Sequence, residues 1–261
     1  MKAIILAAGQ GTRLKKYTED LPKGMLAFRG KTLIERQIET FRTCGIKDII
    51  IVKGYAAEKI DYAGVKYYYN EDYANTNMVE SLMVAQQEFD CDTIVAYSDI
   101  LFSRDMLRRM MECGEDFAAA VDDQWKEYWQ ARYGKVDFDT ESLKIREDGY
   151  ISELGLENPI LSEIDARYIG LLRFSKAGLQ RIVEIMERDY PLYENRAWKQ
   201  SGKPIRKAYM TDLLQALIED GCKIKAERFE HGWLEFDTNE DYEQACEWAE
   251  EDSLARFIDL I

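Results

Sequence analysis

Short apolar runs that alternate with amphipathic segments characterise the first hundred residues of the chain. The run from Ala3 to Ala8 is rich in β-branched residues and stops at Gly9, and Asp48 to Val52 forms a second strand-like segment. Between them, apolar residues recur at helical spacing from Leu33 to Cys44. Short apolar runs of this kind indicate strands buried on both faces of a parallel sheet. The pattern therefore predicts a strand–helix–strand unit.

The same alternation continues further along the chain. Strands are predicted at Val65 to Tyr69, Asp92 to Tyr97 and Phe117 to Val121, with a helix from Val79 to Phe89. Strands that alternate with helices are typical of a doubly wound sheet whose site lies at the carboxyl ends of the strands. We expect the α/β class, a three-layer sandwich with a mostly parallel, Rossmann-like sheet and a small acceptor-binding insertion.

The second half of the chain shows more varied patterning. Asp148-Gly149 between two apolar segments, Ser142 to Ile145 and Tyr150 to Leu154, predicts a hairpin. The remaining predictions are strands at Arg167 to Phe174, Ile224 to Phe229 and Trp233 to Phe236, helices at Lys176 to Arg188, Met210 to Glu219 and from about Asn239, and a loop, with room for one short helix, from Tyr190 to Lys207. Without repeats or a linker, residues 1–261 are expected to form one domain, with a nucleotide half up to about Asp99 and an acceptor half after it.

Composition and charge narrow the class of partner. Apolar residues make up 46% and charged residues 32% of the chain, an ordinary globular composition. A formal net charge of -14 argues against a surface for nucleic acid or anionic membrane, because clustered Lys and Arg hold such partners. Five cysteines without a C-x-x-C pair indicate reduced thiols. With neither a signal-peptide pattern nor an apolar run of ~18 residues, the protein is expected to be cytoplasmic and not membrane-bound.

The first candidate for chemistry is the segment from Leu6 to Leu14, which reads Leu-Ala-Ala-Gly-Gln-Gly-Thr-Arg-Leu and follows the first strand. Glycine lets backbone N–H groups approach phosphate oxygens, and Arg13 adds a forked cation. The spacing matches neither the P-loop nor the dinucleotide fingerprint. Taken by its glycines alone, the segment fits a simple strand-to-helix turn equally well.

A second segment, Leu21-Pro22-Lys23-Gly24-Met25-Leu26, makes the combination specific. Together the two segments resemble the signature of the nucleotidyltransferase family of sugar-nucleotide pyrophosphorylases and cytidylyltransferases, L-A-A-G-x-G-[ST]-R-[LM] followed by P-K. The resemblance implies that the glycine loop wraps a triphosphate, with Arg13 and Lys23 as the catalytic cations. It assigns nucleotide binding to Leu6, Ala7, Ala8, Gly9, Gly11 and Thr12.

Acidic residues at two further strand ends extend this resemblance. Asp99 follows a predicted strand, while Glu235 and Asp237 share one face of another because strand residues alternate. Family members hold a catalytic Mg²⁺ with acidic residues at these two places, which implies Asp99 and Asp237 as ligands with Glu235 as a helper. Mg²⁺ needs only one or two carboxylates beside substrate phosphates and waters.

Several segments place the chain nearest one branch of that family. Asn75 to Leu82 resembles the segment that opens the third helix in CTP-dependent cytidylyltransferases acting on phosphoglutamine, phosphonates or phosphocholine. Asn77 and Ser81 offer groups that can contact a cytosine edge, although Asn75 or Thr76 is also suited to capping a helix. The segments Val121 to Trp125, Arg167 to Leu171 and Tyr209 to Gln215 look most like the phosphoglutamine enzymes.

The insertion near residue 130 is aromatic and leaves two interpretations open. Its residues are Trp125, Tyr128, Trp129, Arg132 and Tyr133. The rings either bind a cationic acceptor, with Arg132 holding a carboxylate or phosphate, or form an apolar core, which is the commoner use of such rings. Asp122-Asp123 departs from the aspartate–lysine pair of the resembled branch, so the resemblance leaves several acceptors open. His231, the sole histidine, is expected to be structural.

These observations predict a Mg²⁺-dependent transfer of CMP from CTP to a small phosphorylated or phosphonylated acceptor, with release of pyrophosphate. The acceptors, in order of expectation, are phosphoglutamine, 2-aminoethylphosphonate and phosphocholine. Two alternatives stay open: a sugar-1-phosphate nucleotidyltransferase that uses UTP or dTTP, and a noncatalytic nucleotide-binding regulatory domain. Neither the acidic charge nor the segment from Leu254 to Ile261 determines an oligomeric state.

Overall fold

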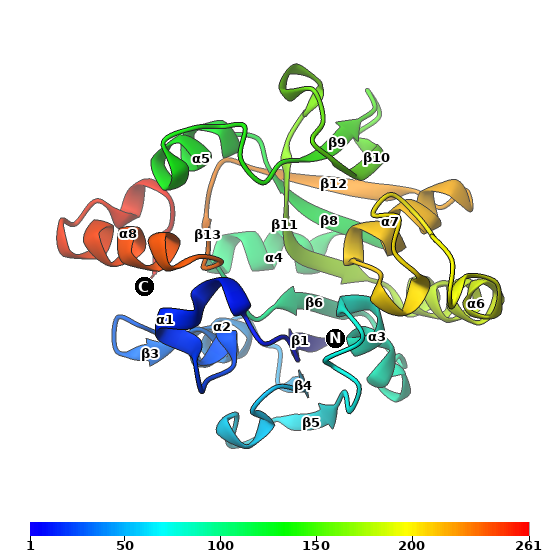
Figure 1. Ribbon diagram of the computed structural model, residues 1–261, viewed down its shortest axis with the longest axis horizontal. Coiled ribbons are helices and arrows are strands. Elements are labelled where there is room, and N and C mark those ends of the chain that lie inside the picture. Colours follow the sequence, from blue (N-terminus) through cyan, green and yellow to red (C-terminus); the bar gives the residue numbers. More distant parts are fainter. Residues whose placement is uncertain (261) are drawn as a thin grey trace.

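The protein is built on one mixed β-sheet. The structure, a computed structural model, describes residues 1–260 except the side chain of Lys15. Within these residues nine strands pair in the order β5-β4-β1-β6-β11-β8-β12-β10-β9 (Figure 1). They are β1 (Lys2–Ala7), β4 (Asp48–Lys53), β5 (Lys66–Tyr69), β6 (Thr93–Tyr97), β8 (Phe117–Asp122), β9 (Glu141–Ile145), β10 (Tyr150–Glu157), β11 (Arg167–Phe174) and β12 (Ile224–Phe229).

The direction of the strands changes in the middle of the sheet. Strands β5, β4, β1 and β6 are parallel to one another, and β12 is parallel to β8. Strand β11 runs antiparallel to both β6 and β8, and the hairpin β9–β10 adds an antiparallel edge. The N-terminal strands therefore direct their carboxyl ends to one side of the molecule, where ligands bind in open α/β sheets.

Two small sheets lie outside the central one. Strands β2 (Ala27–Phe28) and β3 (Lys31–Thr32) form a short hairpin. Strand β7 (Ile100–Phe102) pairs with β13 (Trp233–Glu235), and Phe236 N–H donates to the carbonyl of Asp99 at 2.9 Å. This pairing brings the end of strand β13 beside Asp99, which lies between β6 and β7.

Helices cover both faces of the sheet. On one face lie α2 (Leu33–Thr43), α4 (Arg104–Glu112), α5 (Trp125–Tyr133) and α8 (Asn239–Glu250), and on the other α3 (Met78–Val84), α6 (Lys176–Tyr193) and α7 (Met210–Glu219) (Figure 1). The helix α1 (Lys15–Thr18) is a single turn. Short 3-10 turns lie at Thr12–Leu14, Lys23–Met25, Ala57–Lys59, Gln86–Glu88, Leu161–Glu163, Ile205–Lys207 and Leu254–Arg256.

Each helical layer packs its apolar face on its own side of the sheet. Alternate residues of the strands are buried on opposite faces: Ile5 belongs to the α2 side and Ile4 to the α3 side. Both side chains are fully buried, as expected for a strand covered by helices on both faces. The expected three-layer α/β sandwich with a mostly parallel, Rossmann-like sheet is confirmed.

Two predicted elements have different limits in the structure. The helix expected from Val79 to Phe89 is α-helical only as far as Val84, and a 3-10 turn at Gln86–Glu88 follows it. The loop expected from Tyr190 begins inside α6, which continues to Tyr193 through Pro191. Proline has no N–H to donate to the carbonyl of Glu187, and Glu187 is exposed, so water can take the place of the missing donor.

The aromatic insertion is a helix that belongs to the main core. The rings of Trp125, Tyr128 and Trp129 in α5 are at most 2% exposed. They pack with Trp233 and Phe257 from the C-terminal part of the chain. The interpretation of these three rings as an apolar core is therefore confirmed, although they join the main core rather than a separate subdomain. None of the described helices has the length and apolarity to cross a membrane.

Candidate active site

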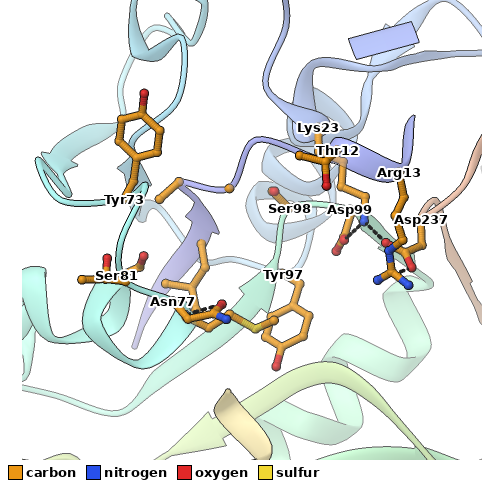
Figure 2. A pocket seen from close by; sticks show the side chains of 16 residues that line it. Thr12, Arg13, Lys23, Tyr73, Asn77, Ser81, Tyr97, Ser98, Asp99 and Asp237 are labelled. Carbon is orange, nitrogen blue, oxygen red and sulfur yellow. Dashed lines mark hydrogen bonds and ion pairs between the residues drawn. The ribbon is translucent and has the colours of Figure 1, made fainter. Parts of the chain in front are cut away.

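A cavity of about 260 Å³ opens at the carboxyl ends of β1 and β6 (Figure 2). It is lined by Leu6, Ala8, Gly9, Gly11, Thr12, Arg13, Lys23, Tyr73, Thr76, Asn77, Met78, Ser81, Tyr97, Ser98, Asp99 and Asp237. These residues come from segments far apart in the sequence, and the parallel strands bring them together. The cavity thus gathers most of the residues that the sequence singled out.

The segment from Leu6 to Arg13 forms one wall of this cavity. Gly11 has a positive φ of 65°, and a Cβ added there would lie 3.0 Å from the Cβ of Lys23. Both the backbone conformation and the close approach therefore favour glycine at this position. Ala7 is the exception among the predicted nucleotide-binding residues, because its side chain is buried in the core and does not line the cavity.

Two cations and two carboxylates form a connected network in the cavity. The Nζ of Lys23 donates to Asp99 Oδ2 and to Asp237 Oδ1, each at 2.5 Å. Arg13 Nη2 lies 2.5 Å from Asp237 Oδ2, and its Nη1 donates to Asp139 at 3.1 Å. Figure 2 shows Lys23 between the two carboxylates, with Arg13 beside Asp237.

Burial makes this network electrostatically strong. The side chain of Lys23 is 12% exposed, and those of Asp99 and Asp237 are 18% and 8% exposed. Burial alone would lower the pKa of Lys23, but Asp99 and Asp237 outweigh it and raise that pKa above its ordinary value. For Asp237, burial together with the nearby charges of Glu235 and Asp99 raises the pKa despite the attraction of Lys23. Lys23 is consequently a fixed positive charge at neutral pH.

The carboxylate of Asp99 keeps one oxygen free. Asp99 Oδ1 is buried and has no hydrogen-bond partner among the described residues. An unsatisfied buried carboxylate oxygen is costly unless a cation or donor approaches it. In the described part of the chain no group of three or more His, Cys, Asp or Glu side chains could hold a metal ion by itself. A hard cation with one or two carboxylates and phosphate oxygens as ligands still fits Asp99 and Asp237.

The opposite end of the cavity is polar but uncharged. The Oδ1 of Asn77 accepts from the N–H of Met78 at 2.9 Å and so caps α3, a role for which the sequence favoured Asn75 or Thr76. The Nδ2 of Asn77 has no partner in the described residues. Ser81 Oγ lies 3.0 Å from the Nδ2 of Asn70, which holds the hydroxyl group in place. Asn77 and Ser81 therefore present fixed donors and acceptors (Figure 2).

Glu235 lies outside this first cavity. Its Oε2 accepts from Arg132 Nη1 at 2.7 Å, while Arg132 Nη2 donates to Asp241 at 2.8 Å. Burial would raise the pKa of Glu235, but Arg132, followed by Arg167 and Lys23, lowers it to about 2. Glu235 is thus a weaker candidate for a metal ligand than Asp99 or Asp237.

The side chain of Arg132 is 1% exposed and cannot receive an acceptor from solvent. The ring of Trp129 is likewise contacted by two of the protein's own arginines. The guanidinium of Arg132 lies 4.7 Å, and that of Arg167 4.6 Å, from the ring centroid of Trp129. The hypothesis that Trp129 and Arg132 contact an acceptor directly is therefore wrong, because their partners lie within the fold.

His231 lies away from both the Lys23 network and the first cavity. Its backbone N–H donates to the buried carboxylate of Asp122 at 3.1 Å, and its ring contacts Phe257. Asp122 also accepts from the indole N–H of Trp233 at 2.9 Å. These contacts fit the structural role that was expected for His231.

A second cavity of about 490 Å³ adjoins the first. The two share Thr12, Arg13, Met78, Tyr97 and Asp237 as lining residues. Among the other residues of the second cavity are Glu141, Arg167, Tyr168 and Glu235. The sequence did not identify Glu141 as a site residue and gave Arg167 no role. The signal that pointed toward Arg167 was the resemblance of Arg167 to Leu171 to the phosphoglutamine enzymes.

Comparison with known proteins agrees with this geometry. Residues 3–188 match the family model described as the MobA-like NTP transferase domain. The chain is 36% identical to CTP:phosphoglutamine cytidylyltransferase of Campylobacter jejuni, over 95% of this chain and all of that protein. It is 39% identical to choline-phosphate cytidylyltransferase of Streptococcus pneumoniae, over 51% of this chain and 59% of that protein.

Solved structures show the same fold. The CTP:phosphocholine cytidylyltransferase from Streptococcus pneumoniae superposes with a TM-score of 0.71 at 25% identity, covering 95% of this chain and 98% of that chain. The inositol-1-phosphate CTP transferase from T. maritima also gives a TM-score of 0.71, at 18% identity, covering 99% of this chain and 97% of that chain.

Proposed function

Because this chain belongs to the MobA-like NTP transferase family, we propose that it transfers CMP from CTP to a small phosphorylated or phosphonylated acceptor and releases pyrophosphate. The observation that carries the proposal is the network of Arg13, Lys23, Asp99 and Asp237 beside the glycine loop. A noncatalytic nucleotide-binding domain needs no such set of converging charges. The similarity to two cytidylyltransferases supports CTP as donor.

In the proposed reaction, an oxygen of the acceptor's phosphate or phosphonate attacks the α-phosphorus of CTP. The bond from the α-phosphorus to the bridging oxygen breaks, and that oxygen leaves with the electron pair as part of pyrophosphate. The acceptor oxygen is already an anion at neutral pH, so no protein base is required. Arg13 and Lys23 stabilise charge on the transferred and leaving phosphates, the main contribution in phosphoryl-transfer chemistry.

The nucleotide occupies the first cavity in this proposal. Backbone N–H groups of the segment from Ala8 to Thr12 contact the triphosphate, while Asn77 and Ser81 contact the cytosine edge. Asp99 and Asp237 would hold Mg²⁺ together with phosphate oxygens, and Glu235 would assist from the second cavity. The ion would supply Lewis-acid stabilisation of the phosphates. The orphaned Asp99 Oδ1 supports this assignment.

Residues 1–99 make up the nucleotide half and residues 100–261 the acceptor half of a single domain in this proposal. Phosphoglutamine is the first acceptor to consider, then 2-aminoethylphosphonate and phosphocholine. All five cysteines are free thiols, which supports a cytoplasmic location.

The direct experiment measures pyrophosphate release with Mg²⁺ for each of the four NTPs against these three acceptors and several sugar 1-phosphates. We expect release with CTP and a non-sugar acceptor. Release only with UTP or dTTP and a sugar phosphate would instead identify a sugar-1-phosphate nucleotidyltransferase. An Asp99→Asn variant that binds CTP and turns over as well as the parent would refute the metal assignment.

A further inference from the structure

The second cavity carries an unusual combination of charges. It is lined by Arg13 and Arg167 and by five carboxylate residues, Asp139, Glu141, Glu157, Glu235 and Asp237. Three of these carboxylates are already paired: Asp139 and Asp237 with Arg13, and Glu235 with Arg132. The remaining charges of the wall are therefore Arg167, Glu141 and Glu157.

Arg167 is held in position without a direct ion pair, and its charge acts on Glu141 and Glu235 from a longer distance. It begins β11, and its guanidinium lies 4.6 Å from the ring centroid of Trp129, one of the most deeply buried side chains. Among the described residues, Arg167 donates no hydrogen bond and has no carboxylate within ion-pair distance. A guanidinium has five N–H donors in a planar fork that matches a carboxylate. Stacking on Trp129 orients this fork at the cavity wall.

Glu141 and Glu157 supply the opposite charge in the same cavity. Glu141 begins β9 and Glu157 ends β10, and the two residues are paired across the hairpin. Neither carboxylate has a hydrogen-bond or ion-pair partner among residues 1–260. Arg167 attracts Glu141 only from beyond ion-pair distance. The cavity thus offers one oriented cation and two carboxylates that have no direct partner among the described residues.

We propose that Arg167 and Glu141 select the acceptor: Arg167 binds the α-carboxylate and Glu141 the α-ammonium group of a phosphorylated amino acid such as phosphoglutamine, with Glu157 at the rim. This inference rests on the proposed function, because it assigns the second cavity to the acceptor. The shared lining of Arg13 and Asp237 places the acceptor's phosphate next to the nucleotide cavity. Phosphocholine has a cation but no carboxylate, and it would leave Arg167 without a partner.

The test compares acceptors within single variants. Phosphoglutamine, its analogue without the α-carboxylate and its analogue without the α-amino group are assayed with CTP on the parent, Arg167→Gln and Glu141→Gln. We expect Arg167→Gln to lower kcat/KM about 10- to 100-fold for phosphoglutamine, the size of a charged hydrogen bond, and less than about threefold for the decarboxylated analogue. Glu141→Gln should show the corresponding selectivity for the amino group.

The ratio of kcat/KM between phosphoglutamine and one of its analogues, measured on a single variant, does not depend on how much of that variant is folded. Arg146→Gln, which removes an exposed arginine paired with Asp148, is the matched control. It should leave this ratio unchanged for both analogues. Calorimetric binding of phosphoglutamine to the parent and to Arg167→Gln tests the same contact without turnover.

The inference would be overturned if Arg167→Gln and Glu141→Gln lost the same factor in kcat/KM with all three acceptors, or if they lost no activity with any of them. Either result would leave cytidylyl transfer intact. A parent enzyme that prefers phosphocholine to phosphoglutamine would also overturn the inference. If none of the tested acceptors supports turnover of CTP, the proposed function fails. The calorimetric comparison then decides separately whether Arg167 binds the carboxylate.

Discussion

Replacing Lys23 by methionine removes the charge that bridges Asp99 and Asp237 and keeps a side chain of similar length. The ammonium lies 2.5 Å from both carboxylates and is mostly shielded from water. Losing one partner of a buried ion pair costs about 3–5 kcal/mol. Arg13 remains 2.5 Å from Asp237, so we expect the lower end of that range. For a chain of this size ~3 kcal/mol corresponds to a fall in Tm of about 6–12 °C.

The same substitution should reduce catalysis by a separate amount. Removing one preorganised charge that stabilises a transition state costs roughly 2.7–4 kcal/mol, or about 10²–10³-fold in kcat. The assay is pyrophosphate release at 25 °C, below the variant's melting transition, with the folded fraction measured by circular dichroism. Lys47→Met is the matched control, because Lys47 is exposed and distant from the cavity lining.

The pH at which the parent and Lys23→Met should be compared follows from the direction in which the pKa of Lys23 is shifted. Its pKa in the folded protein lies above the ordinary value of 10.5. The contribution of Lys23 to stability is therefore fully present below pH 10.5 and is lost as the pH rises through the folded-state pKa. Measurements at about pH 8 report the whole effect.

Two results would refute the reasoning about Lys23. An unchanged Tm would mean that the two carboxylates do not need the bridging ammonium. A lower Tm with turnover within about threefold of the parent would restrict Lys23 to a structural role.

Three further outcomes are expected. Gly24→Ala should lower both Tm and turnover, because its Cβ would lie 2.7 Å from Ile34 and 2.9 Å from Ser98; an unchanged Tm in a thermal melt would contradict this. Glu235→Gln should destabilise the protein by up to about 3 kcal/mol above pH 4.5, because Arg132 lowers the folded-state pKa of Glu235. In denaturant titrations this loss of stability should shrink as the pH falls toward about 2. A loss that grows in acid would refute a lowered pKa for Glu235. Removing divalent ions with a chelator should abolish pyrophosphate release and Mg²⁺ should restore it, whereas persistent activity would exclude a metal requirement.

Local sequence patterns were sufficient to predict many of the strands and the hairpin of the fold. Apolar runs such as Ala3 to Ala8 predicted the buried strands because a strand covered on both faces needs apolar residues at successive positions. Asp148-Gly149 predicted the β9–β10 hairpin, since a tight turn between two apolar segments is a local property. Helix ends were less well determined: α6 passes through Pro191, although proline cannot donate the helical hydrogen bond that normally continues a helix.

The glycine loop and the Lys23 segment predicted a nucleotide site through their combined resemblance to the nucleotidyltransferase signature, and the structure brings both segments to one cavity. What required the tertiary structure were contacts between residues distant in the chain. Nothing near Arg132 in sequence indicated that Asp241 and Glu235 hold its guanidinium. The local pattern also did not show that Arg167 lies against Trp129 without a direct ion pair. The packing of β11 beside α5 decides which charges form ion pairs within the fold and which stay available to a ligand.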